Sequence, residues 1–351
     1  MASVTSTQVV QSLVHQVGYS QVKNIHVVQS LWAGYGRLYS CTADGDSLIV
    51  KHFTPPGTNE EESEDHMRKL KSYGVERVFY ETLSQKLIDR GCIVPACVGC
   101  VEENGSIAIV MRDLGAQYGD YDVRRGNCLN MEEGKRLLSY LARFHAVNWG
   151  QARVEGLWDE GSFWQLGTRM DELRFLDSSW KRWGLDREMA LRIHALVREL
   201  PHRTIVHGDA KAANFFWFSD AVGGYDLQYA GSGSPMRDIA YTLGCSMQEH
   251  LIEAHEESLL RHYHDELSSL LAPEHAAAYS FETMEEAYDL CVADLVRFMC
   301  GSRWWGNIRF VALPVIIHQP DTRFFPLLRS SLPFTRSYLE SKAKKWLAAH
   351  T

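Results

Sequence analysis

Residues 205–214 of the chain are Ile-Val-His-Gly-Asp-Ala-Lys-Ala-Ala-Asn, and residues 224–228 are Gly-Tyr-Asp-Leu-Gln. A run of apolar residues lies between the two stretches, so short strands are predicted on either side of a loop. That loop would present the carboxylate of Asp209 and the amide of Asn214, and the next strand would end at the carboxylate of Asp226. The pattern predicts three oxygen-bearing side chains in one small β-rich region.

These three side chains are of the types that phosphoryl transfer needs. A carboxylate orients and deprotonates the attacking hydroxyl, and oxygen ligands hold the Mg²⁺ that bridges the phosphates. Asp209 is therefore the candidate catalytic base, and Asn214 and Asp226 are the candidate metal ligands. Each residue alone would be expected to form a turn or a helix cap, so the interpretation depends on their combination.

Residues 207–209, with Asn214 five residues after the Asp, resemble the catalytic loop of the aminoglycoside phosphotransferase and choline kinase group. Residues 141–149 are similar to the helix ahead of that loop in the choline kinase-like and ecdysteroid kinase-like branch. Residues 228–241 are similar to the stretch that follows the metal-binding Asp-Phe-Gln of the same branch, with Leu in place of Phe here. The resemblance spans roughly residues 30–245.

The resemblance implies an α+β, protein-kinase-like fold with two lobes. The expected division is a nucleotide-binding lobe at residues 1–115, built on a small antiparallel sheet, and a helical, catalytic and substrate-binding lobe at residues 116–351. It further implies an ATP- and Mg²⁺-dependent kinase that phosphorylates a hydroxyl of a small alcohol, amino alcohol or steroid-like acceptor. The alternative is a catalytically inactive kinase-like protein that binds a nucleotide or metabolite.

A lysine and a glutamate are expected beside the phosphates. Residues 37–42 and 47–53 are β-prone and flank an Asp-Gly pair, which predicts a hairpin. Lys51 lies on the inward face of the second strand, where the family places its phosphate-pairing lysine. In the helix predicted over residues 75–90, Glu76 falls on the apolar stripe and Glu81 about 140° away, so Glu76 is the expected partner of Lys51.

Two further segments are candidates for nucleotide binding. Gly34 and Gly36 precede the first predicted strand and would let the backbone approach the phosphates. Met111 and Asp113 stand where the family's lobe connection grips adenine. Arg112 stands where many relatives carry an acid, and backbone hydrogen bonds to adenine would survive that change.

Composition excludes some classes of protein. The 351 residues carry a formal net charge of -8 and contain no long basic tract, so nucleic-acid binding is not expected. The polar residues 1–11 do not resemble a secretory signal, and no apolar run approaches the length of a membrane helix. Eight cysteines without such a signal fit free thiols and a cytoplasmic location. The expected partner is a small molecule, and the sequence does not indicate an oligomeric state.

Periodicity predicts mostly strands before residue 116 and mostly helices after it. Strands are expected at residues 92–100 and 106–111, and a β-rich island at 203–228. Helices are expected at residues 132–149, 187–200, 237–245, 252–271, 284–300 and 336–349.

Several residues have two possible roles. Cys92, Cys97 and Cys100, with Cys128 downstream, have the spacing of plant-type [2Fe–2S] ligands. The alternative is packing of free cysteines as small hydrophobes, because two of them lie in a strand-like run. Lys211 could neutralise the transferring phosphoryl group or be solvated.

His207 is expected to hold the catalytic loop through hydrogen bonds rather than to act as a base. Trp304 and Trp305 could wall a substrate pocket or simply pack.

Overall fold

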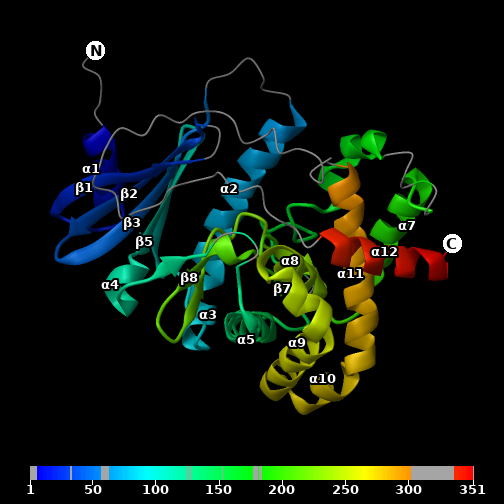
Figure 1. Cartoon of the computed structure of the whole chain (residues 1–351). Helices are drawn as coiled ribbons and strands as arrows, with labels where there is room; N and C mark the ends of the chain where they lie inside the picture. Colours follow the sequence, from blue (N-terminus) through cyan, green and yellow to red (C-terminus); the bar gives the residue numbers. More distant parts are fainter. Residues whose placement is uncertain are drawn as a thin grey trace.

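The amino-terminal half is built on a five-stranded antiparallel sheet (Figure 1). The computed structural model describes residues 6–31, 34–56, 63–124, 126, 128–151, 153–176, 181, 184–301 and 336–350. The spatial order of the strands is β1-β2-β3-β5-β4. Their bounds are β1 (Val22–Ser30), β2 (Gly36–Ala43), β3 (Asp46–Phe53), β4 (Cys97–Glu103) and β5 (Ser106–Arg112).

The predicted hairpin is confirmed and joins β2 to β3. Its turn residues Asp44 and Gly45 have φ of 47° and 95°, which only Gly, Asn and Asp adopt readily. Strand β1 and helix α1 (Ser6–Gln16) were not predicted, because their apolar residues follow neither period over a sufficient length.

Both faces of the sheet are covered. Along β3, Leu48 and Val50 pack with the residues of α1, whereas Ile49 and Phe53 belong to the core beneath α2 (Glu64–Thr82). Successive side chains of a strand point to opposite faces, so Lys51 shares the α2 face. The sheet therefore directs this lysine toward the helix that carries Glu76.

The helix predicted over residues 75–90 begins earlier and is divided in two. Ser63 caps α2, its hydroxyl oxygen accepting a hydrogen bond from the His66 amide at 3.2 Å. Acidic residues in the first turn favour this start. The polar first turns carry little apolar periodicity, which explains why the prediction began too late. A second helix, α3 (Ser84–Asp89), follows directly.

The carboxy-terminal half is helical, with three small β-pairings inserted. All six helices predicted there are present within a few residues of the expected bounds. The helices are α4 (Leu114–Tyr118), α5 (Met131–Val147), α7 (Arg187–Glu199), α8 (Met236–Ser246), α9 (Glu249–Leu270), α10 (Pro273–Ala278), α11 (Phe281–Gly301) and α12 (Arg336–His350). The short strands are β6 (Asp122–Val123), β7 (Thr204–Val206), β8 (Phe215–Trp217), β9 (Val222–Gly224) and β10 (Gly231–Gly233), and the 3₁₀ turns are η2 (Leu166–Thr168), η3 (Met170–Phe175) and η4 (Ala212–Asn214).

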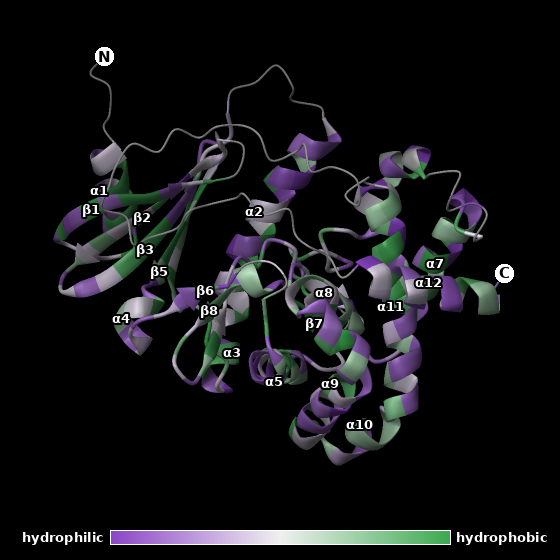
Figure 2. Ribbon diagram, viewed as in Figure 1, coloured by the Kyte–Doolittle hydropathy of each residue, from purple (hydrophilic) through white to green (hydrophobic). Residues whose placement is uncertain are grey.

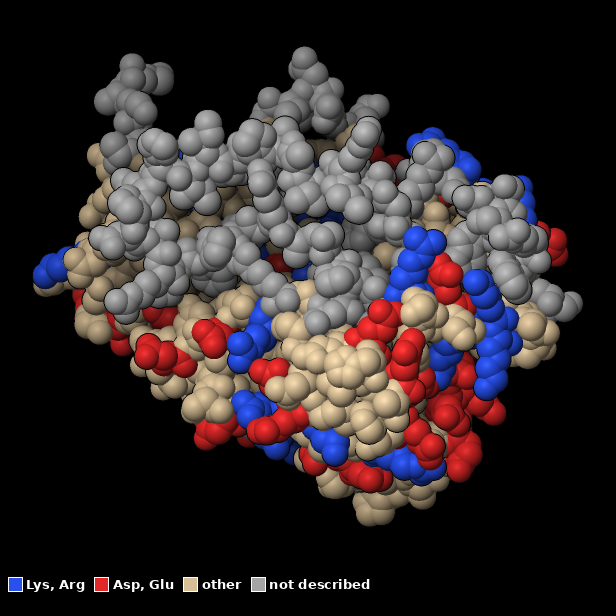
Figure 3. Space-filling view, viewed as in Figure 1, with Lys and Arg blue, Asp and Glu red and all other residues tan. Residues whose placement is uncertain are grey.

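One continuous hydrophobic core runs from the α2 face of the sheet to α11. Helix α11 is buried on every side from Leu290 to Gly301, and Figure 2 shows hydrophobic residues along it, whereas α9 carries many hydrophilic ones. None of the described helices is long and apolar enough to cross a membrane. On the face drawn in Figure 3, acidic and basic side chains are interspersed over the described residues.

Candidate active site

Three elements distant in sequence bring charged side chains together around Lys51. Its Nζ lies 2.6 Å from Oε2 of Glu76 on α2 and 3.1 Å from Oδ1 of Asp226, which follows β9. Lys51 and Glu76 are buried, and the side chain of Asp226 is 33% exposed. The expected contact between Lys51 and Glu76 is present, and Asp226 joins it from 175 positions away. Glu81 instead pairs with Arg77 at the surface.

The electrostatics of this triad follow from one ammonium shared by two carboxylates. Burial alone would lower the pKa of Lys51, but the charges of Asp226 and Glu76 outweigh it and raise that pKa. Burial raises the pKa of Glu76 to about 7 against the effect of Lys51, with the charge of Asp226 adding to the rise. Burial also acts to raise the pKa of Asp226, but Lys51 lowers it overall. Asp226 is therefore ionised at neutral pH, and a cation bound beside it would be favoured.

Asp226 has an unusual backbone conformation. Its φ is 64°, in the left-handed region that costs an L-residue roughly 1 kcal/mol or more. The neighbouring Leu227 is fully buried and so occupies the packing position expected for it. Strained residues of this kind persist where the surrounding structure holds them, and they are frequent at functional sites.

The catalytic loop predicted at residues 207–214 orders the carboxylate of Asp209. Its Oδ2 accepts hydrogen bonds from Lys211 Nζ at 2.9 Å and from Asn214 Nδ2 at 2.8 Å. Its other oxygen, Oδ1, is buried and receives no hydrogen bond from Lys211 or Asn214. The buried hydroxyl of Tyr241 lies within hydrogen-bonding range of the Asp209 carboxylate, and its pKa is raised by burial first and then by the charge of Asp209 and this contact. One face of the Asp209 carboxylate is thus held, and the other can accept a further donor.

Asp238, at the start of α8, holds the loop from behind, a role that the sequence did not reveal. Its carboxylate accepts hydrogen bonds from the backbone amides of His207 at 2.6 Å and Gly208 at 2.9 Å, and contacts Nε2 of His145 at 3.1 Å. The sequence marks Asp238 only as an acidic residue in the first turn of the helix predicted over residues 237–245. These hydrogen bonds are buried, because Asp238 is only 1% exposed.

His207 has the expected structural role. Nε2 of its ring lies 3.1 Å from the carbonyl oxygen of Tyr225 and must donate, so Nδ1 accepts from the Asp209 amide at 3.3 Å. Burial lowers the pKa of this histidine, which matches a neutral ring with one proton. The ring links the catalytic loop to the turn that carries Asp226.

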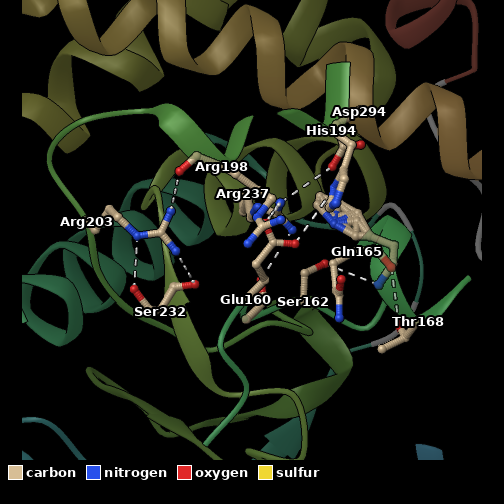
Figure 4. A network of polar contacts seen from close by, with 12 residues as sticks. Glu160, Ser162, Gln165, Thr168, His194, Arg198, Arg203, Ser232, Arg237 and Asp294 are labelled. Carbon is tan, nitrogen blue, oxygen red and sulfur yellow. Dashed lines mark hydrogen bonds and ion pairs between the residues drawn. The ribbon is translucent and has the colours of Figure 1, made fainter. Parts of the chain in front are cut away.

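A buried charge network lies against the same loop (Figure 4). Arg237 donates to the carbonyl oxygen of Gly161 at 3.5 Å and lies 3.9 Å from Glu160 and 4.0 Å from Asp294. Arg237 therefore holds the segment around Glu160, and its neighbour Asp238 holds the catalytic loop. Because the amide of Phe163 donates to the carbonyl oxygen of Gly208 at 3.1 Å, the network braces the segment after Glu160 on the catalytic loop.

Gly34 lies in the connection between β1 and β2, and Gly36 is the first residue of β2. Gly34 and Gly36 have φ of 79° and 133°, and a Cβ at Gly36 would lie 2.1 Å from the carbonyl oxygen of His52. Only glycine fits this close approach. Residues 32 and 33 of the same segment lie outside the described residues.

The segment predicted to grip adenine is already well bonded. Met111 is buried at the end of β5. The amide of Asp113 donates to the Ser47 carbonyl oxygen at 3.1 Å, and its carboxylate accepts from the Ser47 hydroxyl and the Gly115 amide. Arg112 pairs with Asp46 at 2.5 Å. The Asp113 amide and side chain are therefore engaged within the protein, and base contacts here would use carbonyl oxygens or a neighbouring amide.

The structure does not support an iron–sulfur cluster on the cysteines. Among the described residues, no group of three His, Cys, Asp or Glu side chains could hold a metal ion. Strand β4 begins at Cys97, so Cys92 does not lie on it, in contrast to the predicted strand over residues 92–100. Trp304 and Trp305 lie outside the described residues.

The residues present fit a magnesium ion and its nucleotide. The oxygen ligands available are the carboxylate of Asp226 and the side-chain amide of Asn214. The Nδ2 of Asn214 donates to the backbone oxygen and to Oδ2 of Asp209, both at 2.8 Å, so the amide oxygen of Asn214 points away from Asp209. Mg²⁺ in nucleotide sites takes one or two such protein oxygens and completes its shell with phosphate and water. Lys51 beside them supplies the positive charge that phosphate oxygens need.

Comparison with known proteins gives a family and a fold. The sequence model described as "Phosphotransferase enzyme family" matches residues 28–289, and no curated protein sequence matches. A microcompartment-associated aminopropanol kinase has a similar structure, with 12% identity, 98% of each chain covered and a TM-score of 0.51. An amicoumacin kinase in complex with AMP-PNP, Ca²⁺ and Ami has 12% identity, a TM-score of 0.46, and 99% and 94% of the two chains covered. A choline/ethanolamine kinase family protein from Mesorhizobium loti has 13% identity, a TM-score of 0.41, and 94% and 89% covered.

Proposed function

Because this chain belongs to the phosphotransferase enzyme family, we propose that it is an ATP- and Mg²⁺-dependent kinase whose phosphate acceptor is a small molecule with a hydroxyl group. The observation that carries the proposal is the position of Lys51 Nζ, 2.6 Å from Glu76 and 3.1 Å from Asp226. A lysine held between a helix glutamate and a metal-binding aspartate is the arrangement that kinases use on a nucleotide.

In this proposal Lys51, oriented by Glu76, binds the α- and β-phosphates of ATP. Asn214 and Asp226 hold Mg²⁺, which when bound would neutralise charge on the β- and γ-phosphates. The positive φ of Gly34 and Gly36 lets the backbone at the start of β2 approach the phosphates. Met111 and Asp113 lie on the segment assigned to adenine. Residues 1–115 would form the nucleotide-binding lobe and residues 116–351 the catalytic and substrate-binding lobe.

Asp209 acts on the acceptor. Lys211 and Asn214 hold its Oδ2, so the carboxylate has a defined direction before the acceptor arrives. The acceptor hydroxyl donates its hydrogen bond to Oδ1, the oxygen that Lys211 and Asn214 do not contact. Asp209 then aligns that hydroxyl and accepts its proton as the new O–P bond forms. Lys211, bonded to Asp209, offsets the negative charge that accumulates there.

The class of acceptor is a small alcohol, amino alcohol or steroid-like molecule. Fold alone does not transfer a substrate, so the acceptor must be found by experiment. A reducing, cytoplasmic location fits eight cysteines that are not joined in disulfides.

Nucleotide binding is tested first by thermal unfolding with Mg²⁺ and ATP together and with each alone. Mg²⁺-ATP at about 100 times its Kd should stabilise the protein by about 2.7 kcal/mol, a rise of several degrees in Tm. Glu76→Gln should weaken this effect, whereas the matched variant Glu81→Gln, at the surface, should keep it. No rise in Tm under any of these conditions would refute nucleotide binding.

Turnover is tested separately with γ-labelled ATP and a metabolite extract. A newly labelled species detected by mass spectrometry would identify the acceptor. Nucleotide binding with neither a labelled product nor slow ATP hydrolysis would instead favour the second candidate, a kinase-like binding protein. The intact set of Asp209, Asn214, Asp226 and Lys51 favours the enzyme.

A further inference from the structure

Two half-buried cysteines on the edge strand β4 lie side by side. The sulfur atoms of Cys97 and Cys100 are 3.8 Å apart, and neither is in a disulfide. The proposed function uses neither residue. Five of the other six cysteines are buried, so this pair combines contact between two sulfurs with access to solvent.

A β-bulge brings the two side chains to the same face of the sheet. In a regular strand, residues three apart point to opposite faces. Here Cys97 pairs with Met111 and Cys100 with Ile109, which are only two residues apart on β5. The two intervening residues of β4 share the position opposite Val110, and a register shift is present there. The extra residue of the bulge therefore brings Cys97 and Cys100 to the same face of the sheet.

The packing confirms the shared face. Cys97 and Cys100 pack against the core beneath α2, whereas Val98 and Val101 pack against the core beneath α1. A Cβ added at Gly99 would contact Val17, which lies on the α1 side of the sheet. The bulge thus leaves the two intervening residues on one side and the two sulfurs on the other.

The immediate surroundings of the pair favour one reactive sulfur. A hydrogen bond from the Cys100 thiol lowers the pKa of Cys97, against the effects of burial and of the nearby Glu81 charge. The hydrogen bond to Cys97, and then burial, raise the pKa of Cys100. A sulfur with thiolate character beside a second thiol is the arrangement of an attacking and a resolving cysteine.

We propose that Cys97 and Cys100 form a dithiol site that low-molecular-weight disulfides oxidise to an intramolecular disulfide. The Cys97 thiolate attacks a disulfide RSSR, forming a mixed disulfide and releasing RS⁻. The Cys100 thiol gives up its proton and attacks the Cys97 sulfur, which forms the S–S bond and expels the second RS⁻. Both protein sulfurs are oxidised, and RSSR leaves as two RSH. The sulfurs need to approach by less than 2 Å, from 3.8 Å to about 2.05 Å.

The test uses the full chain with oxidised glutathione, followed by alkylation of the remaining thiols and peptide mapping. Trypsin cleavage after Arg90 and Arg112 gives one peptide that holds Cys97, Cys100 and also Cys92. The expected result is a loss of about 2 Da in this peptide with Cys92 alkylated, no fragmentation between residues 97 and 100, and reversal by dithiothreitol.

Single variants assign the two roles. Cys100→Ser should stop at the mixed disulfide, a gain of about 305 Da on Cys97, and Cys97→Ser should lose the reaction. Cys128→Ser, which changes a half-buried cysteine elsewhere, should behave as the parent. Free thiols at both positions in the oxidised parent, or a stable glutathione adduct without the 2 Da loss, would overturn the proposal. The map of the parent protein decides the question even if a variant fails to fold.

Discussion

Replacing Asp209 by Asn tests the proposed base directly. The side chain keeps its volume, and one oxygen can still accept from Lys211 and Asn214, as Oδ2 does at 2.9 and 2.8 Å. The new NH₂ group would then occupy the position of Oδ1, where the proposal places the acceptor hydroxyl. A donor would face the proton that must be removed, and the base would be lost.

The size of the effect follows from the loss of general-base catalysis. Such catalysis contributes typically 10²–10⁴-fold, which corresponds to about 2.7–5.4 kcal/mol of transition-state stabilisation. Binding of Mg²⁺-ATP should remain nearly unchanged, because the contacts of Lys51 are to Glu76 and Asp226. The expected result is a fall in kcat of about two orders of magnitude or more with the nucleotide Kd retained.

The assay is steady-state phosphorylation of the identified acceptor, or ATP hydrolysis without it, beside calorimetric titration of nucleotide. Asp220→Asn is the matched control, because Asp220 is exposed and contacts Ser219. A kcat of Asp209→Asn within about threefold of the parent would refute the assignment of the base, and a comparable fall in Asp220→Asn would show that the effect is not local.

Four further outcomes are expected. Asp226→Ala and Asp226→Gly should both weaken Mg²⁺-dependent nucleotide binding, with the Gly variant about 1 kcal/mol more stable in urea because φ is 64°; equal stabilities would argue against backbone strain there. Gly208→Ala should cost about 2 kcal/mol or more of unfolding free energy, since its Cβ would lie 2.1 Å from a carbonyl oxygen, whereas Gly233→Ala, with its nearest atoms at 3.5 Å, should cost less than about 1 kcal/mol. Asp238→Ala should cost about 3 kcal/mol in the same assay by leaving two backbone amides unpaired, and a loss below about 1 kcal/mol would contradict its anchoring role. Burial lowers the pKa of His207 in the folded protein, so below about pH 6.5 the unfolded chain binds a proton at this ring that the folded protein does not. The free energy of unfolding should therefore fall as pH falls below about 6.5. His207→Gln should reduce this pH dependence, and an unchanged dependence would exclude His207 as a contributor.

Local sequence determined the residue types of the candidate site and much of the secondary structure. The Asp44-Gly45 turn encodes the β2–β3 hairpin because few residues adopt its positive φ. Helical periodicity distinguished the buried Glu76 from the exposed Glu81. It also located the long helices after residue 116, where apolar residues recur near the helical period. Family resemblance added the roles expected of Lys51 and Asp209.

Tertiary packing decided which of these residues meet. Lys51 and Asp226 are 175 positions apart, and no local pattern specifies a contact over that distance. Asp238 stands in the first turn of α8, and the packing of this helix turns it toward the catalytic loop. The bulge that places Cys97 and Cys100 on the same face likewise depends on the pairing of β4 with β5. The physical reason is common to all three: short-range periodicity shows which face of an element is buried, whereas long-range packing selects what that face touches.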